Sequence, residues 1–198
     1  MASTELELAD WRARVAALYL SDVDLKGFRA GRDDLFGNHP QSPIPANERA
    51  SFAGLRYFPF DPGARVEAEL RPAAGQLVID TGGPDGKITY HRVGIAATPW
   101  GELTVWWIDA YGGGLFVPVR DGTGGHETYG GGRYLTDTVK GTHGRGLVWL
   151  GDGRVRLDMN YLYNPSCAYD DEWACPLAPP ENRIDAPIRA GELVYRMP

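Results

Sequence analysis

The chain is poor in cysteine, lacks a basic cluster and has no long apolar run, and each absence removes a class of protein. Two cysteines in 198 residues do not make a disulfide framework. No apolar run approaches the roughly 18 residues that a membrane helix needs, and the acidic N-terminus lacks the apolar segment of a secretion signal. The net charge of -6, without a basic cluster, argues against nucleic acid partners. We therefore expect a cytoplasmic protein with no nucleic acid partner and no membrane partner.

Glycine and proline are plentiful instead, with 26 and 15 residues. This composition favours many turns and short strands over long helices. The length predicts a single domain over residues 1–198. We divide it into a helical segment (1–37), a connector (38–54) and a β domain (55–198).

The start of the chain has helical periodicity. Residues 4–20 carry one apolar stripe, which is formed by Leu8, Trp11, Val15 and Leu18. Thr4 and Glu7 fit a capping box at the start of this helix. A second helix is predicted over residues 24–36, with Gly37 ending it.

From residue 55 onward the pattern is that of strands. Apolar and charged residues alternate over residues 65–71, as in a half-buried strand. Short strands between turns rich in Gly, Asp and Pro predict a mainly β fold, either an antiparallel β-barrel or a β-sandwich, with an N-terminal helical segment. The candidate strands are residues 55–60, 65–71, 76–80, 87–97, 102–108, 115–119, 133–137, 147–150, 154–160 and 192–196.

Residues 158–183, which we call the proline-rich segment, follow neither helix nor strand periodicity. They contain four prolines, both cysteines, and many amide, carboxylate and phenol groups. Proline removes a backbone donor, so this backbone is irregular and its polar groups need side chains or water as partners. Long irregular segments in compact domains are usually functional or disordered, and three tyrosines and a tryptophan argue against disorder. The segment therefore predicts a site.

A second unusual region, the glycine-rich segment, covers residues 112–134 and holds nine of the 26 glycines. Glycine allows close approach of the backbone to a ligand or to another backbone. In a functional interpretation, Arg120 or Arg133 would clamp an anion with help from glycine N–H groups. In a structural interpretation, the segment is a wide hairpin in which Arg120 pairs with Asp121 or Glu127. The two interpretations are about equally supported by the sequence.

Carboxylates among turns and polar neighbours are the best candidates for acid–base catalysis, and we predict Asp121, Glu127 and Asp158 in this role. Each of them could instead cap loop N–H groups or pair with an arginine. The predicted ligand-binding residues are Arg120, Arg133, Tyr129, Asn160, Tyr163 and Glu181. The asparagines could equally satisfy the irregular backbone.

The two cysteines, Cys167 and Cys175, have seven residues between them, which is wider than the usual spacing of zinc ligands. No metal and no cofactor are expected. Cys167 as a nucleophile would need a base such as His126 within reach. A buried structural thiol is the more common role. A disulfide between the two is geometrically allowed, although a cytoplasmic protein would keep it reduced.

Several blocks of the chain together form a specific set of motifs. They include Leu115-Phe116-Val117-Pro118, Arg120-Asp121, His126-Glu127-Thr128-Tyr129, Gly132-Arg133-Tyr134-Leu135, Asp158-Met159-Asn160, Tyr163-Asn164-Pro165, Cys175-Pro176, Pro180-Glu181-Asn182 and Ala190-Gly191-Glu192. Taken together, these blocks resemble DUF1684, an uncharacterised prokaryotic family. The resemblance covers nearly the whole chain and implies a soluble β-rich domain, but it brings no established activity. The chain departs from the family pattern at Met159, at Tyr161 and at Thr123-Gly124.

The sequence leaves three functional hypotheses open. In the first, the glycine-rich and proline-rich segments converge on a polar pocket for a small anionic or oxygenated organic molecule, and carboxylates there support hydrolase or lyase chemistry. In the second, the protein is a non-catalytic ligand-binding or structural β-barrel protein. In the third, it is a cyclase or isomerase that works by the shape of an apolar barrel cavity. The expected partner is a small-molecule ligand or substrate, and a homodimer is compatible with each hypothesis.

Overall fold

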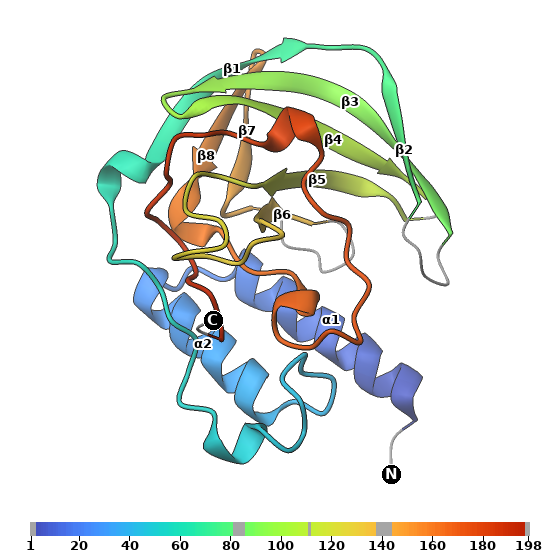
Figure 1. The fold of residues 1–198 in the computed structure, drawn as a ribbon, viewed down its shortest axis with the longest axis vertical. Coiled ribbons are helices and arrows are strands. Elements are labelled where there is room, and N and C mark those ends of the chain that lie inside the picture. Colours follow the sequence, from blue (N-terminus) through green and yellow to red (C-terminus); the bar gives the residue numbers. More distant parts are fainter. Residues whose placement is uncertain (1–2, 81–85, 111, 138–143, 197–198) are drawn as a thin grey trace.

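The computed structural model describes residues 3–80, 86–110, 112–137 and 144–196 (Figure 1). Helix α1 spans Thr4–Leu20 and helix α2 spans Leu25–Asn38, which confirms the two predicted helices. The prediction of a capping box at Thr4 and Glu7 was wrong, because Ser3 is the N-cap and accepts from the Leu6 N–H. Gly37 does not end α2, since the helix continues to Asn38.

An antiparallel sheet of eight strands follows the helices and curls into a half-barrel (Figure 1). The strand order is β6-β5-β4-β3-β1-β8-β7, and β2 pairs with β3. The strands are β1 (Arg65–Pro72), β2 (Gln76–Asp80), β3 (Lys87–Thr98), β4 (Gly101–Asp109), β5 (Gly114–Val119), β6 (Arg133–Thr136), β7 (Leu147–Gly151) and β8 (Arg154–Asp158). The predicted β class and the N-terminal helical segment are therefore confirmed.

Two of the ten predicted strands were wrong. Residues 55–60 and 192–196 form no strand, and the β pairing between them is one isolated bridge between Tyr57 and Glu192. A third prediction, 154–160, ran too far, because Asp158 caps a 3-10 turn over Met159–Tyr161. Alternation of apolar and polar residues shows which side chains can face a core, but it does not show whether a neighbouring strand is available for pairing.

Part of the glycine-rich segment forms β5 and the start of β6, and the proline-rich segment runs from the end of β8 to a 3-10 turn, Pro180–Asn182, that lies against β4 (Figure 1). Their backbones pair at two places. The Tyr134 N–H donates to the Tyr163 carbonyl at 2.8 Å, and the Arg120 N–H donates to the Asn182 carbonyl at 3.0 Å. The glycine-rich and proline-rich segments are therefore joined by backbone hydrogen bonds, and the pocket on which they were predicted to converge stays a prediction.

The buried apolar residues form two clusters. One lies inside the half-barrel and includes Leu103, Val117, Leu135, Leu157 and Ile188. The other is rich in aromatic residues and joins the helices to the sheet and the irregular segments. No helix in the described ranges is long and apolar enough to cross a membrane.

The aromatic cluster is built from edge-to-face ring pairs. Tyr19 of α1 packs on Phe28 of α2 at 4.9 Å between ring centroids and on Tyr163 at 6.1 Å. Tyr163 packs on Tyr134 at 5.9 Å, and Tyr134 on Phe116 of β5 at 4.9 Å. Such pairs add to the energy of burial. The helices are thus attached to the sheet through the proline-rich segment.

Candidate functional site

Arg133 and Asp121, two of the predicted site residues, form a buried ion pair with 2.7 Å between Nη2 and Oδ2. Arg133 also donates to the carbonyl oxygens of Ile188, Ala190 and Glu192. Asp121 accepts from the Ile188 N–H and from the Thr123 N–H and hydroxyl. This pair therefore joins the glycine-rich segment to the chain just beyond the proline-rich segment.

The electrostatics of Asp121 agree with this role. Burial raises the pKa of its carboxyl, but the Arg133 charge and the hydrogen bonds from Thr123 and Ile188 outweigh burial, so the pKa lies below its usual value. Asp121 is an ionised acceptor at neutral pH. Acid–base catalysis by this group would first require it to leave Arg133.

The other predicted residues of the glycine-rich segment point to separate partners. Arg120 donates from Nε to the Gly130 carbonyl at 2.8 Å. Glu127 forms an ion pair of 3.0 Å with Arg189 in which both side chains are exposed. The Tyr129 hydroxyl donates to Cys167 Sγ at 3.6 Å. These contacts are of the kind that the structural interpretation of the segment describes, although Arg120 pairs with a carbonyl rather than with a carboxylate.

Asp158 and Asn160 lie together, as neighbours in one turn. Asp158 Oδ1 accepts from the Asn160 N–H and side-chain amide, and Asp158 Oδ2 lies 3.3 Å from Arg65 Nε. The Asn160 amide also exchanges hydrogen bonds with the backbone of Asp61. The two side chains therefore attach the end of β8 to the start of β1 and to the chain just before it.

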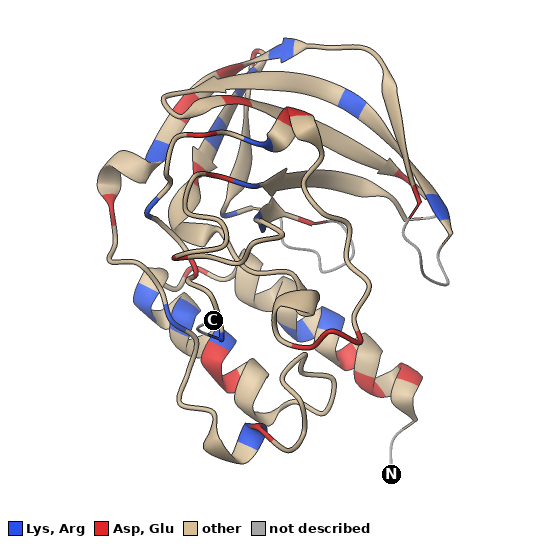
Figure 2. Cartoon of the chain, viewed as in Figure 1, with Lys and Arg blue, Asp and Glu red and all other residues tan. Residues whose placement is uncertain are grey.

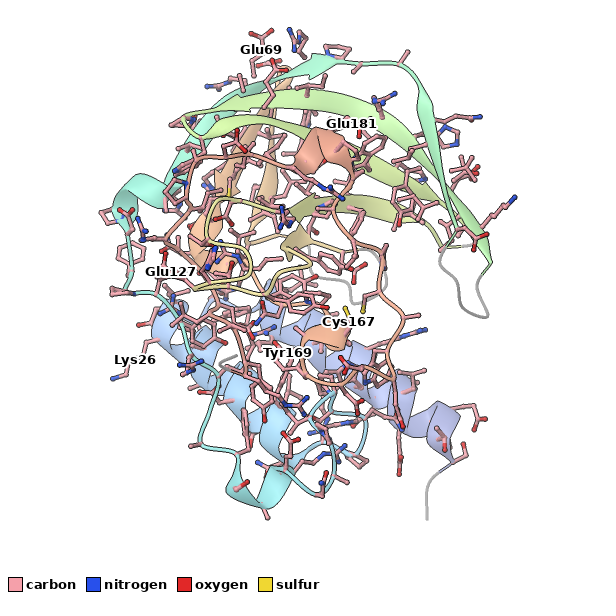
Figure 3. The ribbon with its side chains drawn as sticks, viewed as in Figure 1. Lys26, Glu69, Glu127, Cys167, Tyr169 and Glu181 are labelled. Atoms are coloured by element: carbon pink, nitrogen blue, oxygen red, sulfur yellow. The ribbon has the colours of Figure 1, made fainter. Side chains whose placement is uncertain are left out.

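Tyr163 and Glu181 lie apart from this turn. Tyr163 is buried in the aromatic cluster. Glu181 forms an ion pair of 2.6 Å with Arg92 of β3. Figure 3 shows Glu181 and Glu127 in different parts of the molecule. The structure thus brings together Arg133 with Asp121 and Asp158 with Asn160, but it does not arrange the predicted residues around one of the two cavities described below. Their catalytic and binding roles stay a prediction.

A denser cluster of polar side chains, which the sequence did not predict as a site, surrounds Glu192. The Glu192 carboxylate accepts from Arg32 Nη2 at 2.7 Å, from the Asn164 side-chain amide at 3.1 Å and from the Tyr169 hydroxyl. Arg32 Nε donates in addition to the Tyr57 hydroxyl at 3.1 Å. We call these five residues the Glu192 network.

Four of the five residues of the Glu192 network are buried, namely Arg32, Asn164, Tyr169 and Glu192, and Tyr57 is partly exposed. Burial raises the pKa of Glu192, against the lowering influence of Arg32, Tyr169 and Asn164. Asn164 and Glu192 both fall in the family blocks quoted above, and that was the one available signal for them. No sequence pattern linked Asn164 or Glu192 to Arg32, whose position in the sequence looks like an ordinary surface position of a helix.

Two cavities lie on the helical side of the molecule. The first, of about 440 Å³, opens between α1 and the C-terminal half of α2. His39 in its wall is already satisfied: Nδ1 accepts from the Gln41 N–H, so Nε2 carries the proton and donates to Asp10 at 3.1 Å. Neither ring nitrogen is free to act as a base.

The second cavity, of about 570 Å³, opens beside the N-terminal half of α2. Both signs of charge occur along this helix (Figure 2). The lining combines two cations, two carboxylates and three apolar side chains, which are Lys26, Arg29, Asp24, Asp33, Leu25, Ala30 and Phe60. None of the predicted site residues lines either cavity.

The carboxylates of the second cavity already have partners. Asp24 caps α2 by accepting from the Gly27 N–H at 2.7 Å, and Asp33 accepts from the Leu55 N–H at 2.9 Å. Burial raises the pKa of Asp33 against this hydrogen bond and the charge of Arg32. Among the described residues, no group of three or more His, Cys, Asp or Glu side chains is placed to hold a metal ion.

Comparison with known proteins identifies a family and a similar solved structure. Residues 50–193 match the family described as Protein of unknown function (DUF1684). The solution NMR structure of an uncharacterized protein from gene locus rrnAC0354 of Haloarcula marismortui is similar, with 32% sequence identity and a TM-score of 0.56. That similarity covers 96% of this chain and 97% of the archaeal chain. Among curated proteins, none matches significantly.

Proposed function

The chain belongs to the DUF1684 family, which brings no activity with it, and we propose that it is a binding protein for a small organic anion held in the cavity beside α2. The proposal keeps the ligand class that the sequence suggested and moves the site to Lys26 and Arg29. It does not require a reaction, because the carboxylates predicted as catalytic each hold another group of the protein.

The observation that carries the proposal is the state of Arg29. Its guanidinium lies 4.4 Å from the centre of the Tyr57 ring and donates from Nη1 to the Phe58 carbonyl at 3.2 Å. Its Nε and Nη2 are buried without an acceptor, and it makes no ion pair within the described ranges. Unpaired buried charge is costly, so an anionic ligand that pairs with Arg29 is favoured.

The rest of the lining suits an organic anion. Lys26 also lacks an ion pair in the described part of the chain and supplies a second cation. Phe60, whose side chain is 60% exposed, offers an apolar surface to the carbon skeleton of the ligand. Asp33, whose Oδ1 accepts from the Leu55 N–H, can accept from a ligand hydroxyl at Oδ2.

The position of Arg29 depends on the Glu192 network. Tyr57 stacks under Arg29 and accepts from Arg32, which in turn pairs with Glu192. The covered nitrogens Nε and Nη2 are reached only if neighbouring side chains shift on binding. The cavity wall can shift in this way, because the Glu192 network fixes it on one side while Phe60 on the other side is exposed.

The proposal is tested by a thermal-shift screen with a panel of mono- and dicarboxylates, hydroxy acids, amino acids and phosphate monoesters, followed by calorimetry. We expect one class to bind saturably and more weakly at high salt. Arg29→Gln should weaken binding by roughly tenfold or more, since a charge-assisted hydrogen bond contributes about 1.5–3 kcal/mol. Lys26→Gln should weaken it less, because Lys26 is more exposed.

Arg12→Gln is the matched control, because Arg12 is an exposed arginine on α1 that does not line the cavity. It removes the same charge and should leave the affinity unchanged. Equal weakening by Arg12→Gln and Arg29→Gln, or no saturable binding of any panel member, contradicts the proposal.

A further inference from the structure

Cys167 and Cys175 lie side by side although seven residues separate them. The Cys167 N–H donates to Cys175 Sγ at 3.4 Å, and the two thiol groups are in hydrogen-bonding contact. Neither is in a disulfide, and both are partly exposed to solvent. They bracket most of a surface strap, residues 167–177, which carries the exposed side chains of Trp173 and Leu177.

From this arrangement we infer that Cys167 and Cys175 form a redox-active pair that exchanges with low-molecular-weight organic disulfides. The pair is independent of the anion cavity, whose lining contains neither cysteine. The motivation is geometric: a thiol attacks a disulfide quickly when it is accessible, and it closes an internal bond when a second thiol is already in contact.

The surroundings of the two sulfur atoms assign the order of reaction. Cys175 Sγ accepts a backbone N–H, which stabilises its thiolate. Cys167 is disfavoured as the first thiolate, because the neighbouring Cys175 thiol and burial raise its pKa. Cys175 is therefore the attacking cysteine and Cys167 the resolving one.

The reaction balances in two exchange steps. The Cys175 thiolate attacks one sulfur of the organic disulfide, forms a mixed disulfide and releases the other half as a thiolate. Cys167 then loses its proton to solvent, and its sulfur attacks Cys175 Sγ. The Cys167–Cys175 bond forms and the second half leaves as a thiolate. The protein is oxidised by two electrons, and the organic disulfide is reduced to two thiols.

Tyr129 supports the second step. Its hydroxyl donates to Cys167 Sγ at 3.6 Å, and a donor at this position stabilises the resolving thiolate. Once Cys175 is in a mixed disulfide, it no longer competes with Cys167 as the thiolate of the pair. Tyr129 is a positioning residue here, and its presence in the glycine-rich segment gives a site role to one residue that the sequence singled out.

Oxidation should also restrain the strap. Next to Cys175, the Pro176 carbonyl accepts from the Tyr134 hydroxyl at 2.6 Å, so one end of the strap is already attached to the aromatic cluster. Closing the bond between Cys167 and Cys175 would make the residues between them a short ring. We expect proteolytic cleavage within this ring to slow on oxidation and to recover on reduction with a dithiol.

The test uses the whole reduced protein and excess oxidised glutathione under native conditions. We expect the wild type to lose both free thiols and the mass of two hydrogen atoms, without a lasting glutathione adduct. Cys167→Ser should accumulate a mixed disulfide at Cys175. Cys175→Ser should form an adduct at Cys167 roughly tenfold more slowly, because burial still raises the pKa of that thiol after the Cys175 thiol is removed.

Three results would overturn the inference: a wild type that keeps both thiols, one that carries glutathione on both cysteines, or one that forms only intermolecular dimers. Equal rates for the two serine variants would overturn the assigned order. The measurement on the wild type tests the inference by itself, so the test remains valid even if a serine variant fails to fold. The Tyr129→Phe variant should slow the release of the second glutathione and leave the first attack unchanged.

Discussion

Arg32 of α2 donates to the Glu192 carboxylate at 2.7 Å, and 160 positions of sequence separate the two residues. Both side chains are buried. The contact joins the helical segment to the C-terminal part of the chain through charges rather than through apolar packing. Removing either partner of such a buried ion pair strongly destabilises the protein, because the remaining charge is then buried without a counter-charge.

We expect Glu192→Gln to destabilise the protein by about 3–5 kcal/mol, since it leaves the Arg32 charge buried and unpaired. Urea unfolding, followed by circular dichroism, measures the free energy of unfolding. Glu181→Gln is the matched control, because Glu181 pairs with Arg92 in a partly exposed ion pair, and it should cost less than about 1 kcal/mol. A similar cost for both substitutions would show that the Glu192 network does not hold the helices.

We expect Asp121→Asn in the glycine-rich segment to destabilise the protein for the same reason. Arg133 would lose its carboxylate while remaining fully buried among the carbonyl groups of residues 188–192. The expected loss is again about 3–5 kcal/mol, measured by urea unfolding. Glu127→Gln, whose partner Arg189 is exposed, should change the stability by less than about 1 kcal/mol. A stable Asp121→Asn protein that binds no ligand would instead support a functional role for Asp121.

The pH dependence of stability should reveal the lowered pKa of Asp121. A carboxyl with a lower pKa in the folded state stabilises the protein above its unfolded pKa, about 3.9 for Asp, and loses this contribution as the pH falls through the folded value. The stability difference between wild type and Asp121→Asn should therefore shrink as the pH falls below about 4. A difference that grows on acidification would mean that Arg133 does not hold Asp121 ionised.

The local parts of the fold could be predicted from the sequence. The apolar stripe of α1 and the alternation in β1 follow from periodicity, which the chain carries locally. The predictions failed where a distant partner decides the outcome. Tyr57 and Glu192 look like strand residues, yet they share one bridge. Arg32 looks like a surface residue, but it is buried against Glu192 and the rings of Phe36 and Tyr163.

The same limit applies to the candidate site. Ionisable residues in irregular segments were correctly singled out as unusual, and the structure shows that Asp121 and Asp158 accept hydrogen bonds that hold those segments in place. Whether a carboxylate meets an arginine or an empty cavity is set by tertiary packing. Arg29 gave no signal in the sequence, because its lack of a partner is visible only when every nearby carboxylate is placed.

Gly191 directly precedes Glu192, and its backbone provides a last test of how the Glu192 network is positioned. Its φ is +77°, and a Cβ at this residue would lie 2.6 Å from Leu162 Cβ and equally close to the Leu162 carbonyl oxygen. Gly191→Ala therefore combines left-handed strain of about 1–2 kcal/mol with overpacking of about 1–3 kcal/mol. We expect a total loss of roughly 3 kcal/mol in urea unfolding, together with weaker anion binding because the wall behind Arg29 shifts.

Gly151→Ala is the control, with φ +86° and open space around the new methyl group. It should show only the cost of left-handed strain and normal anion binding. If the two variants unfold alike, the close contact between Gly191 and Leu162 does not position Glu192.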